Sequence, residues 1–100
     1  MTEPNIEELT QAVERQHGGT ATPLQAVHVK EAFRGQTLWE GDVQVFQILD
    51  HPKTNRAYAW SAPVKGSTKR RIYTVLRIAP IDTPQAAVRA AIAADHRGGR

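Results

Sequence analysis

Apolar residues recur at helical spacing in two segments, one near each end of the chain. In residues 5–17 the apolar stripe is formed by Ile6, Leu9 and Val13. Asn5 and Glu8 have the spacing of a capping box, which favours a helix start at this point. Residues 85–95 contain no helix breaker and follow Pro84, a residue favoured in the first turn of a helix. The pattern therefore predicts one helix at each end.

Between these helices, hydrophobic and polar residues alternate as they do in β-strands. Residues 24–34 fit a helix capped near Thr22 and Pro23, but also a strand in which valines alternate with polar residues, and we prefer the strand. Three further strands are predicted at residues 38–49, 57–62 and 71–79. Apolar residues change phase within 38–49, which indicates either a bulge or a strand buried on both sides.

This order of elements predicts an α+β fold, with a four-stranded antiparallel meander sheet flanked by an N-terminal and a C-terminal helix. We expect both helices on one face of the sheet. The core is predicted to contain Ile72, Leu76, Ile78, Val88 and Ile92. By domain organisation, we expect the N-terminal helix and a flexible Gly-Gly connection in 1–23, the domain core in 24–97, and a frayed tail in 98–100.

Length and composition are those of one globular domain. The chain has 100 residues, of which 40% are hydrophobic and 23% are charged. It contains no cysteine, which excludes disulfides, thiolate metal sites and thiol nucleophiles. The N-terminus lacks the features of a secretory signal, and no apolar run approaches the roughly 20 residues that cross a bilayer. We expect a soluble, cytoplasmic protein.

Catalytic residues are not indicated by spacing. The four histidines fall in separate predicted segments; these are His17, His28, His51 and His96. No pair of them has the spacing of a metal site, so we predict no catalytic residue, no metal and no cofactor. A catalytic role would require a concave pocket that holds His28 or His51 beside a carboxylate.

Positive charge is concentrated in the second half of the chain. Residues 1–23 carry four glutamates and one arginine (net −3), whereas 24–100 carry twelve basic and six acidic residues (net +6). Between His51 and Arg77 there are seven basic residues and no acidic one. Basic side chains beside aromatic rings are typical of polyanion binding. The candidate phosphate contacts are Lys65, Lys69, Arg70 and Arg71, with Lys53 and Arg56 at the other end of the third strand.

The candidate residues for stacking on bases are Tyr73 and Trp60. In the fourth strand, Arg71, Tyr73 and Arg77 are expected on the outward face, opposite Ile72 and Leu76. The alternative is that Tyr58 and Trp60 belong to the core, because large residues there alternate with small ones.

Two resemblances bear on the function. The element order resembles that of the double-stranded RNA-binding domain (helix, three strands, helix). However, this chain has an extra strand, and Asp82-Thr83-Pro84-Gln85 stands where that family has its lysine-rich motif, so the activity is not carried over. The segments 35–41, 51–53, 57–60 and 87–92 are similar to a family of small uncharacterised bacterial proteins, which implies no activity.

We therefore predict a small, non-enzymatic binding or interaction protein. Its partner would be a protein of unknown identity or a second copy joined through an edge strand. The alternative is binding of RNA or single-stranded DNA through the basic, aromatic region 51–77. An enzyme with a histidine–carboxylate pocket is the second alternative.

Overall fold

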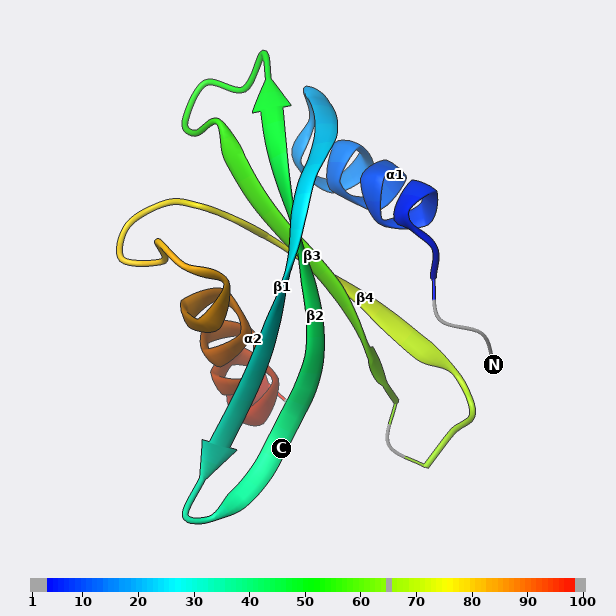
Figure 1. Ribbon diagram of the computed structural model, residues 1–100, viewed down its shortest axis with the longest axis vertical. Helices are drawn as coiled ribbons and strands as arrows, with labels where there is room; N and C mark the ends of the chain where they lie inside the picture. The colour runs from blue at the N-terminus through cyan, green and yellow to red at the C-terminus, as the bar shows by residue number, and fades with distance from the viewer. Residues whose placement is uncertain (1–3, 65, 99–100) are drawn as a thin grey trace.

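The computed structural model describes residues 4–64 and 66–98 and confirms the predicted order of elements (Figure 1). The chain forms an α+β fold in which four antiparallel strands make a meander sheet of order β1-β2-β3-β4. The elements are α1 (Ile6–His17), β1 (Thr20–Phe33), β2 (Gln36–Leu49), β3 (Arg56–Pro63), β4 (Arg70–Leu76) and α2 (Pro84–Gly98). No helix in the described ranges is long and apolar enough to cross a membrane.

The start of α1 is the predicted capping box. The Asn5 side chain accepts a hydrogen bond from the Glu8 backbone N–H at 2.9 Å, and the Glu8 carboxylate accepts from the Asn5 N–H at 2.9 Å. The helix ends at Gly18, whose φ of 83° favours glycine. β1 begins only two residues later, at Thr20, so the connection is shorter than expected.

The first hairpin is long, and the ambiguous segment 24–34 is a strand. β1 pairs with β2 from Thr20↔Leu49 to Phe33↔Gln36, with two register shifts. One shift leaves Leu24 without a partner on β2, and the other leaves Leu38 without a partner on β1. Both leucines are exposed, so the bulges direct apolar side chains to solvent.

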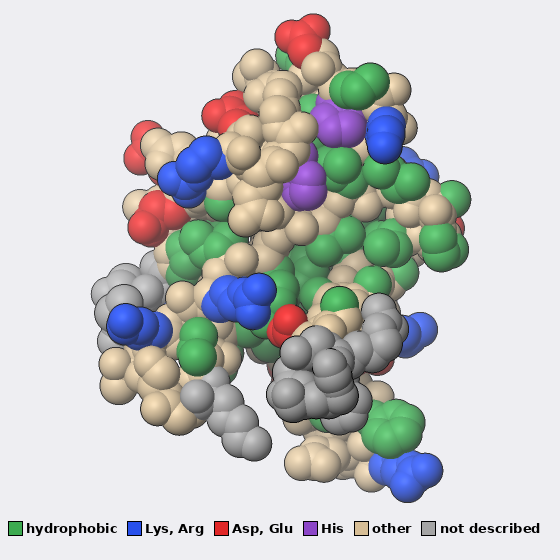
Figure 2. Space-filling model, turned by 180° about the vertical axis from the view of Figure 1, so that it is seen from behind, with side chains coloured by type: hydrophobic (Ala, Val, Ile, Leu, Met, Phe, Trp, Pro, Cys, Tyr) green, Lys and Arg blue, Asp and Glu red, His purple; other side chains and the backbone are tan. Residues whose placement is uncertain are grey.

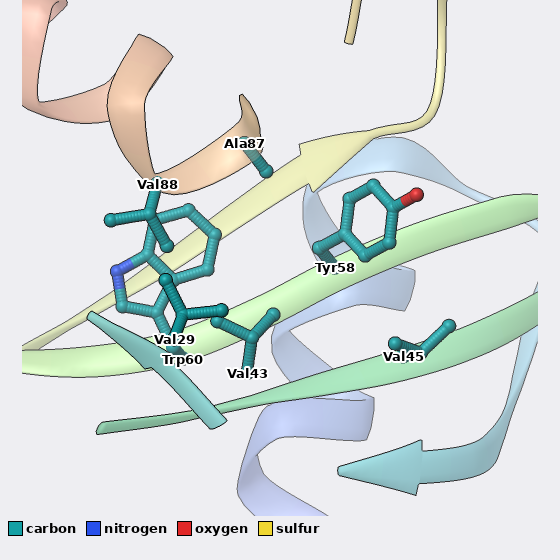
Figure 3. Close-up of a cluster of buried hydrophobic side chains, with 7 residues drawn as sticks. All are labelled: Val29, Val43, Val45, Tyr58, Trp60, Ala87 and Val88. Atoms are coloured by element: carbon teal, nitrogen blue, oxygen red, sulfur yellow. The ribbon is translucent and has the colours of Figure 1, made fainter. Parts of the chain in front are cut away.

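The two helices cover opposite faces of the sheet, so the expectation of both helices on one face was wrong. One core cluster, on the α2 side, contains Val29, Val43, Val45, Tyr58, Trp60, Ala87 and Val88 (Figure 3). The other, on the α1 side, contains Val13, Ala21, Phe46, Ile48, Ala57 and Ala59. Each central strand contributes to both clusters. β2 is therefore the strand buried on both sides that the phase change in its sequence indicated.

The predicted core residues of the last strand and helix have different burial. Val88 is fully buried, Leu76 and Ile92 are half-buried against the two clusters, and Ile72 is half-buried. Ile78 is 40% exposed, contrary to prediction. The reason is that β4 ends at Leu76, so Ile78 lies in the loop that follows the strand.

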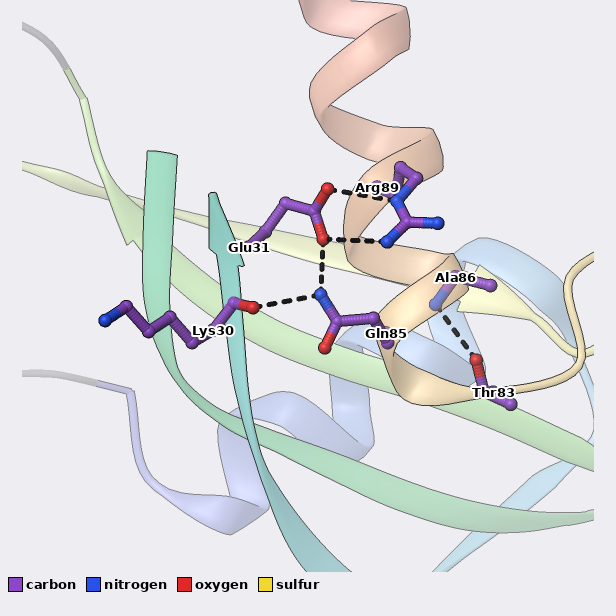
Figure 4. Close-up of polar contacts among 6 residues, drawn as sticks. All are labelled: Lys30, Glu31, Thr83, Gln85, Ala86 and Arg89. Carbon is purple, nitrogen blue, oxygen red and sulfur yellow. Dashed lines mark hydrogen bonds and ion pairs between the residues drawn. The ribbon is translucent and has the colours of Figure 1, made fainter. Parts of the chain in front are cut away.

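Polar contacts attach α2 to both hairpins. Near its start, the Thr83 hydroxyl accepts from the Ala86 N–H, and Gln85 and Arg89 both donate to the buried carboxylate of Glu31 on β1 (Figure 4). Near its other end, Asp95 accepts a hydrogen bond from the hydroxyl of Tyr73 on β4. α2 thus contacts the first and last strands of the sheet and spans the space between them.

Candidate functional site: a cleft between two hairpin arms

The sheet divides into two arms because its central strands pair over only a short distance. β2 pairs with β3 only from Gln44↔Ala59 to Gln47↔Arg56. Beyond Gln44 the β1–β2 hairpin and the β3–β4 hairpin diverge, as Figure 1 shows at the lower end of the molecule. From behind, the same end has two projections separated by a notch (Figure 2).

A cleft of about 500 Å³ lies at this divergence, and we call it the arm cleft. Its volume falls in the range of ordinary ligand sites. One wall comes from the β1–β2 arm and the opposite wall from Trp60, Ser61 and Arg70 of the β3–β4 arm. Pro4, Ile6 and Leu9, at the start of α1, line a third side, and Ile6 is 44% exposed there. The arm cleft therefore combines polar walls with an apolar border.

His28 on β1 lies between two carboxylates of β2. Its Nδ1 is 3.0 Å from the Asp42 carboxylate, and its Nε2 is 2.9 Å from the Glu40 carboxylate. The hydrogen bond to Glu40 raises the pKa of His28 above its usual value, and the hydrogen bond to Asp42 makes a smaller contribution in the same direction. The same contact with His28 lowers the pKa of Glu40. Both ring nitrogens are engaged, so the imidazole has no nitrogen left to act on a substrate in this arrangement.

The backbone of β2 presents unused pairing groups to the arm cleft. The Ile48 N–H donates to the Asn55 carbonyl on the β3 side. Alternate residues of a strand direct their backbone groups to the same side, so those of Glu40 and Asp42 also face β3. Continued in the same register, the ladder would pair Val43 with Trp60 and then Asp42 with Ser61, but it ends at Gln44 before both pairs.

The facing edge of β3 is occupied by its own arm. Arg70 donates from Nε to the Ser61 hydroxyl at 3.0 Å and from Nη2 to the Ser61 carbonyl at 3.2 Å. Pro63, further along, has no backbone N–H to offer. Within the described strands, the open edge at the arm cleft is therefore that of β2.

Two aromatic rings, Trp39 and Trp60, line the cleft on the α2 side, where backbone pairing is missing. The ring centroids of Trp39 and Trp60 are 6.2 Å apart, and the Trp60 ring stacks on Tyr73 with centroids 5.5 Å apart. Gly41 allows this packing, since a Cβ at that position would lie 2.8 Å from the Trp39 ring. These contacts join the two arms through side chains.

The aromatic residues proposed for base stacking are part of this packing. Trp60 is only 2% exposed, which corrects its assignment as a stacking surface, and Tyr58 is likewise in the core. Tyr73 is half-buried on the α2 side and not on a free outward face, because α2 covers that face. Burial and the hydrogen bond to Asp95 raise the pKa of the Tyr73 hydroxyl.

The basic residues proposed for phosphate contacts are not gathered in one place. Arg70 is engaged with Ser61, and Arg71 lies over the Tyr73 ring, with a nitrogen 3.8 Å from the Asp95 carboxylate. Lys69 is exposed beside these arginines, whereas Lys65 lies outside the described residues. Lys53 and Arg56 are at the opposite end of β3. A polyanion role for these residues stays a prediction.

Sequence reasoning missed the group formed by His28, Glu40 and Asp42. The pairing of Phe33 with Gln36 beside the turn, continued without a shift, would place His28 opposite Gly41 and not opposite Asp42. The bulge at Leu38 changes that register, so the facing pairs could not be assigned from the sequence. Among the described residues, no group of three or more His, Asp or Glu is placed to hold a metal ion.

Comparison with known proteins gives no match to a protein-family model, a curated protein or a solved structure.

Proposed function

We propose that this protein is a binding protein that captures an extended segment of a partner polypeptide in the arm cleft. The bound segment pairs with the open edge of β2 and adds a strand between the two arms. The main support for the proposal is that the backbone of Glu40 and Asp42 faces the arm cleft beyond the end of the β2–β3 ladder. Main-chain hydrogen bonds would supply affinity, as in other cases of strand addition.

Two other sheet edges are less suited to strand addition. The outer edge of β1 carries Pro23, the bulge at Leu24 and Lys30, and such features discourage pairing with another chain. The β3 edge at the arm cleft is occupied by Arg70. The β2 edge has none of these obstructions at Gly41 and Asp42, and it borders the exposed apolar side chain of Ile6.

A neutral extended peptide tests the proposal directly. The probe is acetyl-Thr-Thr-Val-Thr-Thr-amide, compared with the same peptide methylated at every backbone nitrogen. The chain has two tryptophans, Trp39 and Trp60, and both line the arm cleft, so their fluorescence reports on binding. We expect a fluorescence change with the unmethylated peptide, together with NMR shifts of the Glu40 and Asp42 amides.

A pair of variants provides the matched control on the protein side. Asp42→Pro removes the N–H that faces the cleft, whereas Asp42→Asn keeps it. Since this N–H points away from β1, the proline should leave the first hairpin paired. Binding should be lost in Asp42→Pro and kept in Asp42→Asn. Equal binding of the methylated peptide, or amide shifts confined to the outer edge of β1 or β4, would exclude strand addition at β2.

Acid–base catalysis by His28 is the second candidate, because the arm cleft meets the criterion of a concave pocket with a histidine beside a carboxylate. Two features favour binding instead: both ring nitrogens are occupied, and the nearest hydroxyl of the facing wall, that of Ser61, is bound to Arg70. A panel of ester and phosphoester substrates tests catalysis. Turnover that disappears in His28→Gln would establish it.

A further inference from the structure

The side chains around the open edge of β2 indicate which segment the arm cleft would accept. In a strand paired with β2, the residues opposite Glu40 and Asp42 project on the same face as these two carboxylates. The residue between them, opposite Gly41, projects toward the α2 side. Each position of a bound segment therefore faces a different part of the cleft.

We propose, building on the function above, that the arm cleft selects a segment with the pattern basic–apolar–basic. The two basic side chains pair with the carboxylates of Glu40 and Asp42, which lie at alternate positions of β2. Opposite charges directly across a ladder stabilise strand pairing, and like charges oppose it. The partner class is thus an extended polypeptide segment with lysine or arginine at positions i and i+2.

The central apolar position follows from Gly41. Trp39 packs where a side chain of Gly41 would stand, and its ring is half-buried beside Trp60. A side chain opposite Gly41 would approach these rings from the cleft. Valine, isoleucine or an aromatic residue fits this environment, since β-branched and aromatic residues pack well against aromatic cross-strand neighbours.

In the structure, His28 contacts the same Glu40 and Asp42 carboxylates that the basic side chains of the partner would contact. Protonated His28 forms ion pairs with both of them, at 2.9 Å to Glu40 and 3.0 Å to Asp42. Lys30 on the same arm adds a positive charge near Glu40, and Arg70 faces them from the other arm. The part of α1 that lines the cleft, Ile6 and Leu9, contributes no charge.

His28 should therefore compete with a basic ligand when it is protonated. As pH rises through its raised pKa, the imidazole loses its charge and the two carboxylates become available to the ligand. Affinity for a basic segment should increase over that range. The neutral and acidic segments should not gain affinity in this way.

Three peptides that differ in two positions test the specificity: acetyl-Thr-Lys-Val-Lys-Thr-amide, the Thr-Thr-Val-Thr-Thr form and the Thr-Glu-Val-Glu-Thr form. We expect the lysine peptide to bind roughly fivefold more tightly than the neutral one, and the glutamate peptide to bind most weakly. The lysine preference should disappear in the Glu40→Gln, Asp42→Asn double variant. In His28→Gln it should increase and no longer depend on pH between 6 and 8.

The outcomes separate this inference from the proposed function. Equal affinity of the three peptides, with amide shifts still at Glu40 and Asp42, would overturn the specificity and leave strand addition intact. Absence of binding by all three would overturn both. Displacement of the lysine peptide by the oligonucleotide dT10, or a concentration-dependent dimer with the same amide shifts, would identify a different occupant and overturn the inference.

Discussion

Truncation of Val13 tests whether α1 is seated on the sheet as the structure shows. The Val13 side chain is completely buried against the alanines and Phe46 on the α1 side of the sheet. Val13→Ala removes two methyl groups, which corresponds to about 1.6 kcal/mol at about 0.8 kcal/mol per buried carbon. The cavity left behind adds about 1 kcal/mol. We therefore expect the free energy of unfolding to fall by about 2–3 kcal/mol.

Val64→Ala is the matched control, because it removes the same atoms from a side chain that is 40% exposed. Its effect should stay within about 0.5 kcal/mol. Urea unfolding followed by tryptophan fluorescence measures both variants, and thermal unfolding should show a loss of about 10–20 °C for Val13→Ala alone. Similar stabilities of Val13→Ala and Val64→Ala would refute the seating of α1, and with it the third side of the arm cleft.

Two further predictions concern the fold around α1. Gly19→Ala should destabilise the protein strongly, because Gly19 has a φ of 76° and a Cβ there would collide with the Leu49 carbonyl. The control is Gly18→Ala, in which the added Cβ meets open space and only the strain of the positive φ remains. Equal unfolding midpoints of the two variants would contradict this prediction. Burial lowers the pKa of His17, whose Nε2 is 2.9 Å from the Thr74 hydroxyl, so the folded state binds fewer protons than the unfolded state just below pH 6.5. The stability that neutral His17 contributes is present above pH 6.5 and falls as pH decreases toward the lowered pKa. Between pH 8 and pH 5, the free energy of unfolding should therefore decrease less in His17→Gln than in the wild-type protein.

Local signals in the sequence were sufficient for the element order but not for the layers. The capping box of Asn5 and Glu8, the strand alternation and the breaker-free last helix each depend on neighbouring residues, so they could be identified. The placement of the helices depends on which side of β3 each one covers. Small residues such as Ala57 and Ala59 are compatible with exposure as well as with burial, so they did not indicate that a helix covers this side of β3. In the structure, they are buried beneath α1.

The candidate site was less predictable because it arises from missing pairing. Nothing local in residues 38–49 indicates that the ladder to β3 stops at Gln44, since that depends on how the arms pack against α2. The bulge at Leu38 likewise changes which residues face His28. The basic and aromatic residues of 51–77 were evident, but their ion pairs, burial and separation are tertiary features.

The attachment of α2 at two points makes this helix a spacer between the arms. Arg89 binds Glu31 on the first strand, and Asp95 binds Tyr73 on the last, six residues further along the helix. At 1.5 Å per residue, the anchor points are separated by about 9 Å along the helix axis. Inserting or deleting one residue between them would rotate one anchor by about 100° relative to the other. The opening between the hairpins should therefore tolerate substitutions in this stretch of helix far better than changes in its length.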